Sequence, residues 1–136
     1  MVRQGALSEP RLSRGTGPGI WAARCAEQRR GADDQDYRPG FITANRNRAC
    51  GDAPSIPGKN CDEFPLATTR EGLSAGGTRR TFTGCNINAP ANSTGPTGAS
   101  ACMITATEND AQGAVIAAFY YDWRVLNNDR YRVGAY

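Results

Sequence analysis

The pattern of hydrophobic and polar positions predicts short elements joined by long loops. Residues 78–83 alternate and contain Thr and Phe, so they are predicted to form a strand, and residues 100–106 a second one. Between them, residues 86–98 are rich in Asn, Pro, Gly, Ser and Thr and predict a long loop. Residues 109–121 give the clearest helix, with Thr107 as its expected N-cap. The apolar stripe of this helix, interpreted as a core-facing surface, comprises Val115, Ile116, Phe119 and Tyr120.

The remaining segments complete a small α+β domain. Short helices are predicted over residues 20–30, where Gly31 is a stop signal, and over residues 42–50. Residues 66–71 predict one helical turn, and residues 130–133 a final edge strand. Residues 1–19 mix Gly, Pro, Ser and Arg without periodicity, which is typical of a disordered leader. We therefore expect one domain over residues 20–136.

The cysteine and histidine content of the chain indicates disulfides and not a Cys/His metal site. The chain has five Cys, no CxxC pair and no His, so zinc sites of the Cys/His type are not expected. A chain of 136 residues has a marginal core that cross-links would stabilise. A Cys50–Cys61 bridge would be worth roughly 3 kcal/mol in the chain-entropy model, and Cys85 and Cys102 could join the two predicted strands. That leaves Cys25 unpaired, or paired outside this chain.

Disulfides indicate an oxidising compartment. Yet residues 1–20 lack the apolar core of a signal peptide, and no stretch reaches the roughly 20 apolar residues of a membrane span. Three explanations stay open: the export signal is missing, the chain is a released piece of a longer protein, or the start is misassigned. The net charge of +3 is modest, and residues 1–50 carry nine Arg against five acidic residues. Charge alone therefore says little about nucleic acid.

Without His, the tools left for catalysis are carboxylates, amides, Arg and hard metal ions. Asp62 and Glu63 stand next to Cys61, and Glu108 and Asn109 stand at the start of the predicted helix. Each pair has a plain alternative, a solvated surface for the first and helix capping for the second. Neighbouring side chains on a strand point to opposite faces, so at most one carboxylate of the first pair is expected in a given site.

The segment Cys61-Asp62-Glu63-Phe64-Pro65-Leu66-Ala67-Thr68-Thr69-Arg70-Glu71-Gly72 resembles the signature of the NucA/NucB deoxyribonuclease domain family. The similarity extends over about residues 42–134. It includes Asn45-Arg46-x-x-Ala49-Cys50, Glu108-Asn109-x-x-Gln112-Gly113, Phe119-Tyr120, Arg124-Val125-Leu126 and the segment near Tyr131 and Val133.

The resemblance implies a fold and a set of roles. The fold would be a small core similar to ββα-metal nucleases: a β-hairpin with a long loop, then a helix, then an edge strand. The activity would be metal-dependent, sequence-nonspecific cleavage of DNA by a secreted or toxin-type endonuclease using Mg²⁺ or Mn²⁺. Asp62 would be the general base and Glu108 a catalytic metal ligand, with Glu63 and Asn109 as further metal contacts. Arginines suit phosphate, and on chemical grounds the candidates are Arg79, Arg80 and Arg124.

Two other functions remain open at this stage. One is a non-catalytic, secreted, disulfide-stabilised domain that binds nucleic acid without cutting it. The other is a released toxin domain with the same chemistry, which would need an immunity or inhibitor protein as a partner. No membrane association is expected.

Overall fold

The computed structural model describes residues 26–31, 40–93 and 97–133. Its elements, in chain order, are β1 (Ala26–Arg29), α1 (Phe41–Cys50), β2 (Lys59–Phe64), the short 3₁₀ helix η1 (Leu73–Ala75), β3 (Thr78–Arg80), β4 (Gly98–Thr105), α2 (Ala106–Asp122) and β5 (Arg130–Val133). The predicted leader over residues 1–19 and Cys25 lie outside the described residues. The predicted α+β class is confirmed.

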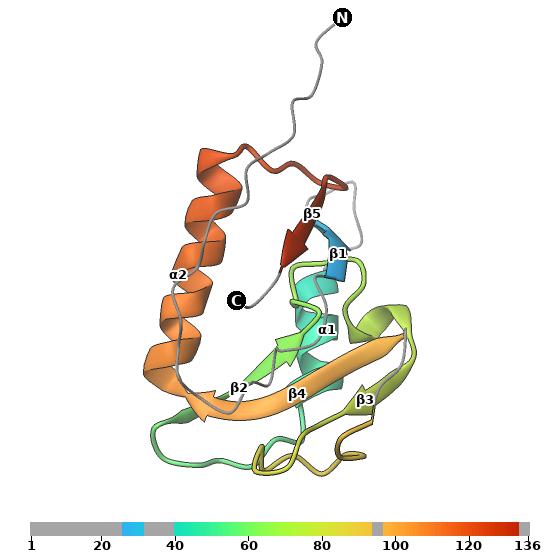
Figure 1. Ribbon diagram of the computed structural model, residues 1–136, viewed down its shortest axis with the longest axis vertical. Coiled ribbons are helices and arrows are strands. Elements are labelled where there is room, and N and C mark those ends of the chain that lie inside the picture. The colour runs from blue at the N-terminus through green and yellow to red at the C-terminus, as the bar shows by residue number, and fades with distance from the viewer. Residues whose placement is uncertain (1–25, 32–39, 94–96, 134–136) are drawn as a thin grey trace, which may run out of the picture.

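Strand β4 is the centre of a three-stranded sheet in the order β2-β4-β3. Figure 1 shows it running along the base of the molecule, with α2 rising from its end. β2 is antiparallel to β4 and places Asp62 opposite Cys102. β3 is parallel to β4, so the predicted hairpin between these two strands is wrong. The long connection through residues 81–97 acts as a crossover, which parallel strands require.

Both predicted disulfides are confirmed. Cys50 at the end of α1 is bonded to Cys61 in β2, with 5.8 Å between their Cα atoms. Cys85 in the crossover is bonded to Cys102 in β4, with 4.5 Å between Cα atoms. The apolar clusters that pack against Cys50 and Cys61 are small and rich in Ala, consisting of Ala49, Leu73 and Ala99 in one and Ile87, Ala101 and Met103 in the other. Cross-links therefore supplement a core that buries little apolar surface.

A second, two-stranded sheet corrects the expectation of a helix over residues 20–30 for its described part, residues 26–30, whereas residues 20–25 lie outside the described residues. Ala26–Arg29 form a strand, not a helix, and pair antiparallel with β5. Tertiary contacts override the local helix propensity. The backbone of β1 forms a ladder of hydrogen bonds with β5. The side chain of Gln28 is buried, and its Oε1 accepts from the Leu66 amide at 3.1 Å. The predicted edge strand at residues 130–133 is confirmed as β5, but it pairs with β1 and does not join the three-stranded sheet.

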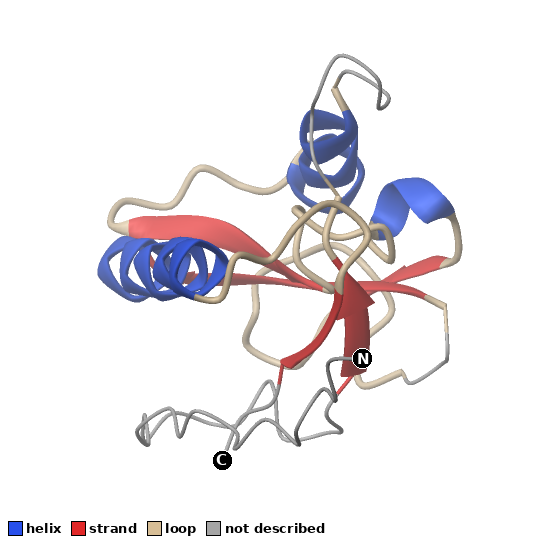
Figure 2. Cartoon of the chain, turned by 90° about the horizontal axis from the view of Figure 1, so that it is seen from above, coloured by secondary structure: helices blue, strands red, loops and turns tan. Residues whose placement is uncertain are grey.

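Helix α2 begins three residues earlier than expected. Its N-cap is Thr105, not Thr107, and it forms a capping box with Glu108 in which the Thr105 hydroxyl accepts from the Glu108 amide and donates to the Glu108 carboxylate. No residue of α2 is buried, and Val115 is 47% exposed. The interpretation of the apolar stripe as a core surface is therefore wrong for Val115, while Ile116, Phe119 and Tyr120 are half-buried. Figure 2, viewed from above, shows α2 nearly end-on at one side of the sheet.

Helix α1 confirms the helix predicted at residues 42–50. Residues 66–71 form two successive turns, closed by Thr69 N to Leu66 O and Gly72 N to Thr69 O, and the helical turn comes later, at η1. The Phe64–Pro65 peptide bond is cis. Within the described ranges, no helix has the length and apolar character to cross a bilayer.

The buried side chain of Asn45 attaches this turn region to α1. Its Nδ2 donates to the carbonyls of Ala67 and Thr69 at 2.8 and 3.0 Å, and its Oδ1 accepts from the Ser74 amide at 2.8 Å. Gly72 is needed beside it, because a Cβ there would lie 2.4 Å from the Asn45 amide group. The loop that follows the acidic strand β2 is thus positioned by one amide side chain.

We expect Asn45→Ala to lower the free energy of unfolding by about 3 kcal/mol, because two buried backbone groups and one partly buried one would lose their partner. Urea unfolding followed by circular dichroism measures this. Asn47→Ala on the exposed face of the same helix is the matched control and should change stability by less than about 0.5 kcal/mol. Equal losses in the two variants would contradict the role given to Asn45.

Candidate active site

The acidic end of β2 borders a cavity of about 410 Å³ between α1, β2 and α2. Its polar lining residues are Arg46, Asp62, Glu63, Thr68, Asn109 and Gln112. The Cys50–Cys61 disulfide borders it as well, so the cross-link holds two of its walls together. A cavity with a few convergent polar groups is the usual form of a binding or catalytic site.

Helix α2 presents one continuous face to this cavity. Asn109, Gln112, Gly113, Ile116 and Tyr120 line it at the spacing of successive helical turns. The face is polar near the start of the helix and apolar further along. Tyr120 terminates it, and its hydroxyl is hydrogen-bonded to Thr68 at 2.8 Å and to the Tyr131 hydroxyl of β5. The β1–β5 sheet thereby supports the far wall of the cavity.

Asp62 is a buried ionisable group at the edge of this cavity. It is 7% exposed, and its Oδ2 is buried without a hydrogen-bond partner among the described residues. Burial raises the pKa of the Asp62 carboxyl from 3.8 to about 6, although a backbone hydrogen bond from Glu63 opposes this. A buried carboxylate oxygen without a partner is costly and indicates that a water, a cation or a substrate group belongs there.

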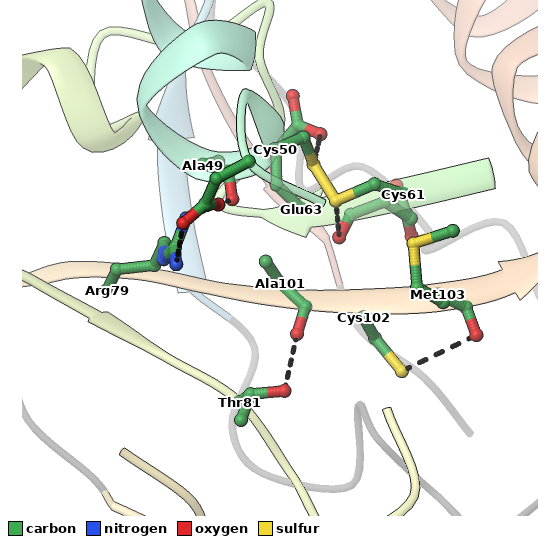
Figure 3. Close-up of a disulfide and its surroundings, with 11 residues drawn as sticks. Ala49, Cys50, Cys61, Glu63, Arg79, Thr81, Ala101, Cys102 and Met103 are labelled. Carbon is green, nitrogen blue, oxygen red and sulfur yellow. Dashed lines mark hydrogen bonds and ion pairs between the residues drawn. A yellow bond between two sulfur atoms is a disulfide. The ribbon is translucent and has the colours of Figure 1, made fainter. Parts of the chain in front are cut away.

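Glu63 is similarly buried, at 8% exposure, and its Oε2 lies 3.6 Å from Cys50 Sγ. Figure 3 shows Glu63 beside the Cys50–Cys61 bridge. Burial and then the charge of Asp62 raise the pKa of Glu63 to about 7, whereas the Arg46 guanidinium acts in the opposite direction. Both carboxyl residues border the same cavity, contrary to the expectation that at most one of them would contribute to a given site.

In a comparison with known protein families, the family model described as deoxyribonuclease NucA/NucB matches residues 21–134 of the chain. The chain belongs to the NucA/NucB deoxyribonuclease family. The match begins earlier than the resemblance over residues 42–134 and takes in β1, which pairs with β5. Searches of curated proteins and of solved structures found no match. Membership of a deoxyribonuclease family makes DNA the substrate and nuclease the enzyme class.

Within this NucA/NucB domain, Glu108 and Asn109 differ in their position relative to the cavity. Asn109 borders the cavity, as does Gln112, which the sequence analysis quoted only as part of the motif. Glu108 is exposed and does not line it; its Oε2 accepts from the Thr105 hydroxyl at 2.7 Å. The capping alternative therefore has direct support, and the assignment of Glu108 as a catalytic metal ligand stays a prediction.

The three arginines proposed for phosphate lie away from this cavity. Arg79 forms an ion pair with the carboxylate of Asp52, which raises the pKa of Arg79 and lowers that of Asp52. Arg80 is buried and donates to the Thr97 carbonyl at 2.6 Å. Arg124 borders a different cavity, at the far end of α2.

Arg46 on α1 is the cavity arginine that sequence reasoning missed. The available signal was its position in the Asn45-Arg46 motif, one residue after the buried Asn45. Since successive helical residues lie about 100° apart, Arg46 flanks the face that packs inward. It therefore reaches the cavity while remaining exposed.

The donor atoms around the cavity suit a hard cation. In the part of the chain that the structure describes, no group of three or more His, Cys, Asp or Glu is arranged to hold a metal. Mg²⁺, however, is commonly held by one or two carboxylates with water completing its shell. Asp62 and Glu63 with the amide oxygens of Asn109 and Gln112 offer that kind of set, and the unpartnered Asp62 Oδ2 fits it.

The two buried carboxyls predict an unusual pH dependence for metal-free protein. Because their folded pKa values of about 6 and about 7 lie above the unfolded values, stability is highest near pH 4 and falls as the pH rises through 7. Burying each charge costs on the order of 3 kcal/mol. We expect the melting temperature in EDTA to fall between pH 4.5 and pH 7.5, and Asp62→Asn/Glu63→Gln to reduce that fall.

The matched control is Asp110→Asn, which removes an exposed carboxylate from α2 and should keep the wild-type pH profile. If the double variant lost stability with rising pH as steeply as the wild type, ionisation of Asp62 and Glu63 would not be the cause of that loss.

Proposed function

We propose that this protein is a divalent-metal-dependent, sequence-nonspecific DNA endonuclease, with Asp62 and Glu63 at its chemical centre. The observation that carries the proposal is the pair of buried carboxyls bordering one cavity, one of them with an unpartnered oxygen. In a chain without His, such a carboxylate is the group best suited to accept a proton from water. Family membership supports DNA as the molecule that is cut.

Asp62 is proposed as the general base. With a pKa of about 6 it is mostly ionised at neutral pH, yet more basic than a solvated carboxylate. It would accept the proton of the water that attacks the phosphorus, and its burial keeps competing solvent away from the carboxylate. Burial thus matches the basicity of this group to neutral pH.

Glu63 and Asn109 would hold the cation, with Glu108 joining them if its carboxylate leaves the Thr105 hydroxyl. Mg²⁺ or Mn²⁺ bound there would stabilise negative charge on the phosphate and on the leaving oxygen. Arg46 would bind a non-bridging phosphate oxygen, because a guanidinium matches phosphate geometry. Its position beside Glu63 also offsets the negative charge of the acidic pair.

These groups address the sugar-phosphate backbone and not base edges, which supports sequence-nonspecific cleavage. The two disulfides support action in an oxidising compartment, so we propose that the enzyme works as a secreted nuclease or a released toxin domain. In the toxin case, an immunity or inhibitor protein would be its partner.

Asp62→Asn is expected to lower the rate of plasmid nicking in Mg²⁺ or Mn²⁺ by about 10²–10⁴-fold, the usual contribution of a general base. Excess EDTA should abolish wild-type nicking, and added Mg²⁺ or Mn²⁺ should restore it. Asn47→Ala serves as the control for handling and folding. DNA binding without cleavage in any divalent metal would instead favour a non-catalytic binding domain.

Glu108→Gln separates the two roles of Glu108. Glutamine preserves the capping box, so the melting temperature should stay within about 2 °C of the wild type. Loss of nicking at unchanged stability, accompanied by weaker Mn²⁺ binding in calorimetry, is expected if Glu108 is a metal ligand. Wild-type rates and wild-type Mn²⁺ affinity would leave Glu108 with capping alone.

A further inference from the structure

A second cavity of about 780 Å³ lies at the far end of α2. We call it the α2-end groove; its lining residues are Arg30, Ala117, Tyr120, Tyr121, Asp122, Arg124, Val125 and Leu126. Ala117 and Tyr120 also line the candidate active site, so the two hollows adjoin each other along α2. A ligand that enters the active site from this side would lie across both.

The α2-end groove combines positive charge with exposed flat or apolar side chains. Tyr121 is 84% exposed and Leu126 is 66% exposed. The guanidinium of Arg30 lies 4.6 Å from the centre of the Tyr120 ring and donates to the Val125 carbonyl, so its charge is fixed at the junction. Arg30 and Arg124 stand against one carboxylate, that of Asp122, among the lining residues. Cationic grooves with exposed aromatic rings suit a nucleic-acid strand.

Arg124 stands at a backbone position where glycine is the favoured residue. Its φ is 49°, and the Val125 amide donates to Tyr120 O while the Arg124 amide donates to Tyr121 O. This is the Schellman pattern that ends a helix, with Arg124 at the left-handed position. A long side chain there carries a conformational cost that glycine would avoid. Costs of this kind persist where the side chain has a use, and here the side chain is an exposed cation on the groove.

We propose that the α2-end groove binds the DNA strand that leads away from the scissile phosphate, with Arg124 on a backbone phosphate and Tyr121 as a stacking surface for a base. The proposal rests on the proposed nuclease function. Asn109 to Tyr121 spans about 18 Å of helix, which corresponds to roughly five nucleotides at 3.4 Å per step along one strand. The groove is therefore a subsite for flanking nucleotides that lie beyond the reacting phosphate.

The test compares cleavage of a 20-nucleotide and a 4-nucleotide DNA substrate in Mg²⁺. Arg124→Ala and Tyr121→Ala are each expected to lower the ratio of kcat/KM for long over short substrate by about five- to tenfold, mainly through KM for the long one. Tyr121→Phe should retain the wild-type ratio, because it keeps the ring. The salt dependence of long-strand binding should weaken by about one phosphate contact in Arg124→Ala.

Arg124→Gly provides a readout that a structural role would not produce. It should raise the melting temperature, because glycine relieves the left-handed backbone, while still lowering the long-over-short ratio. Arg132→Ala removes another exposed charge, on β5 and outside both cavities, and should leave the ratio at the wild-type value.

The outcomes separate the two proposals. Cleavage of both substrates by the wild type, with ratios unchanged in Arg124→Ala and Tyr121→Ala, would overturn the subsite and leave the nuclease intact. If the wild-type protein cleaved neither substrate, the proposed nuclease function itself would be overturned. Unchanged DNA ratios together with lost binding of a co-expressed inhibitor protein would assign the groove to a protein partner, which also overturns the DNA subsite.

Discussion

The structure is built around one costly feature, a pair of adjacent carboxyls kept out of water. Asp62 and Glu63 are held there by backbone pairing of β2 with β4 and by the cross-link from Cys61 to the end of α1. Charge repulsion and lost hydration both oppose this arrangement. A core made largely of small side chains supplies little free energy to resist them. Covalent bridges and backbone ladders therefore do what a larger apolar core would do in another protein.

The same tension gives Asp62 the basicity that the proposed mechanism requires. A solvated carboxylate is too weak a base to activate a nucleophile efficiently at neutral pH. A carboxyl that is completely buried has a pKa above neutral pH and would be protonated, so it could not act as a base. Asp62 lies between these limits, because burial raises the pKa of its carboxyl while a backbone hydrogen bond opposes the rise. Arg46 is close enough to Glu63 to influence its ionisation. Basicity is thus set by position, without histidine.

Much of this could be anticipated from the sequence, and the failures share a physical origin. Both disulfides and the α1 helix follow from spacing and local propensity, and the acidic motif pointed to the family. The strand at Ala26–Arg29 could not be found locally, because its partner lies about a hundred residues away. The parallel pairing of β3 with β4 depends on the path of a crossover that carries no periodic signal. Arg46 and Gln112 enter the site only through how α1 and α2 pack around β2.

The pairing of β1 with β5 has a consequence for biosynthesis. The earliest described strand of the domain has its partner in the latest one, and Tyr131 of that last strand supports the cavity wall through Tyr120. A ribosome that has completed α2 still holds a chain in which this wall has no backing. The wall is therefore completed only once β5 has been synthesised and has paired with β1, so the candidate site takes its final form after the whole domain has left the ribosome.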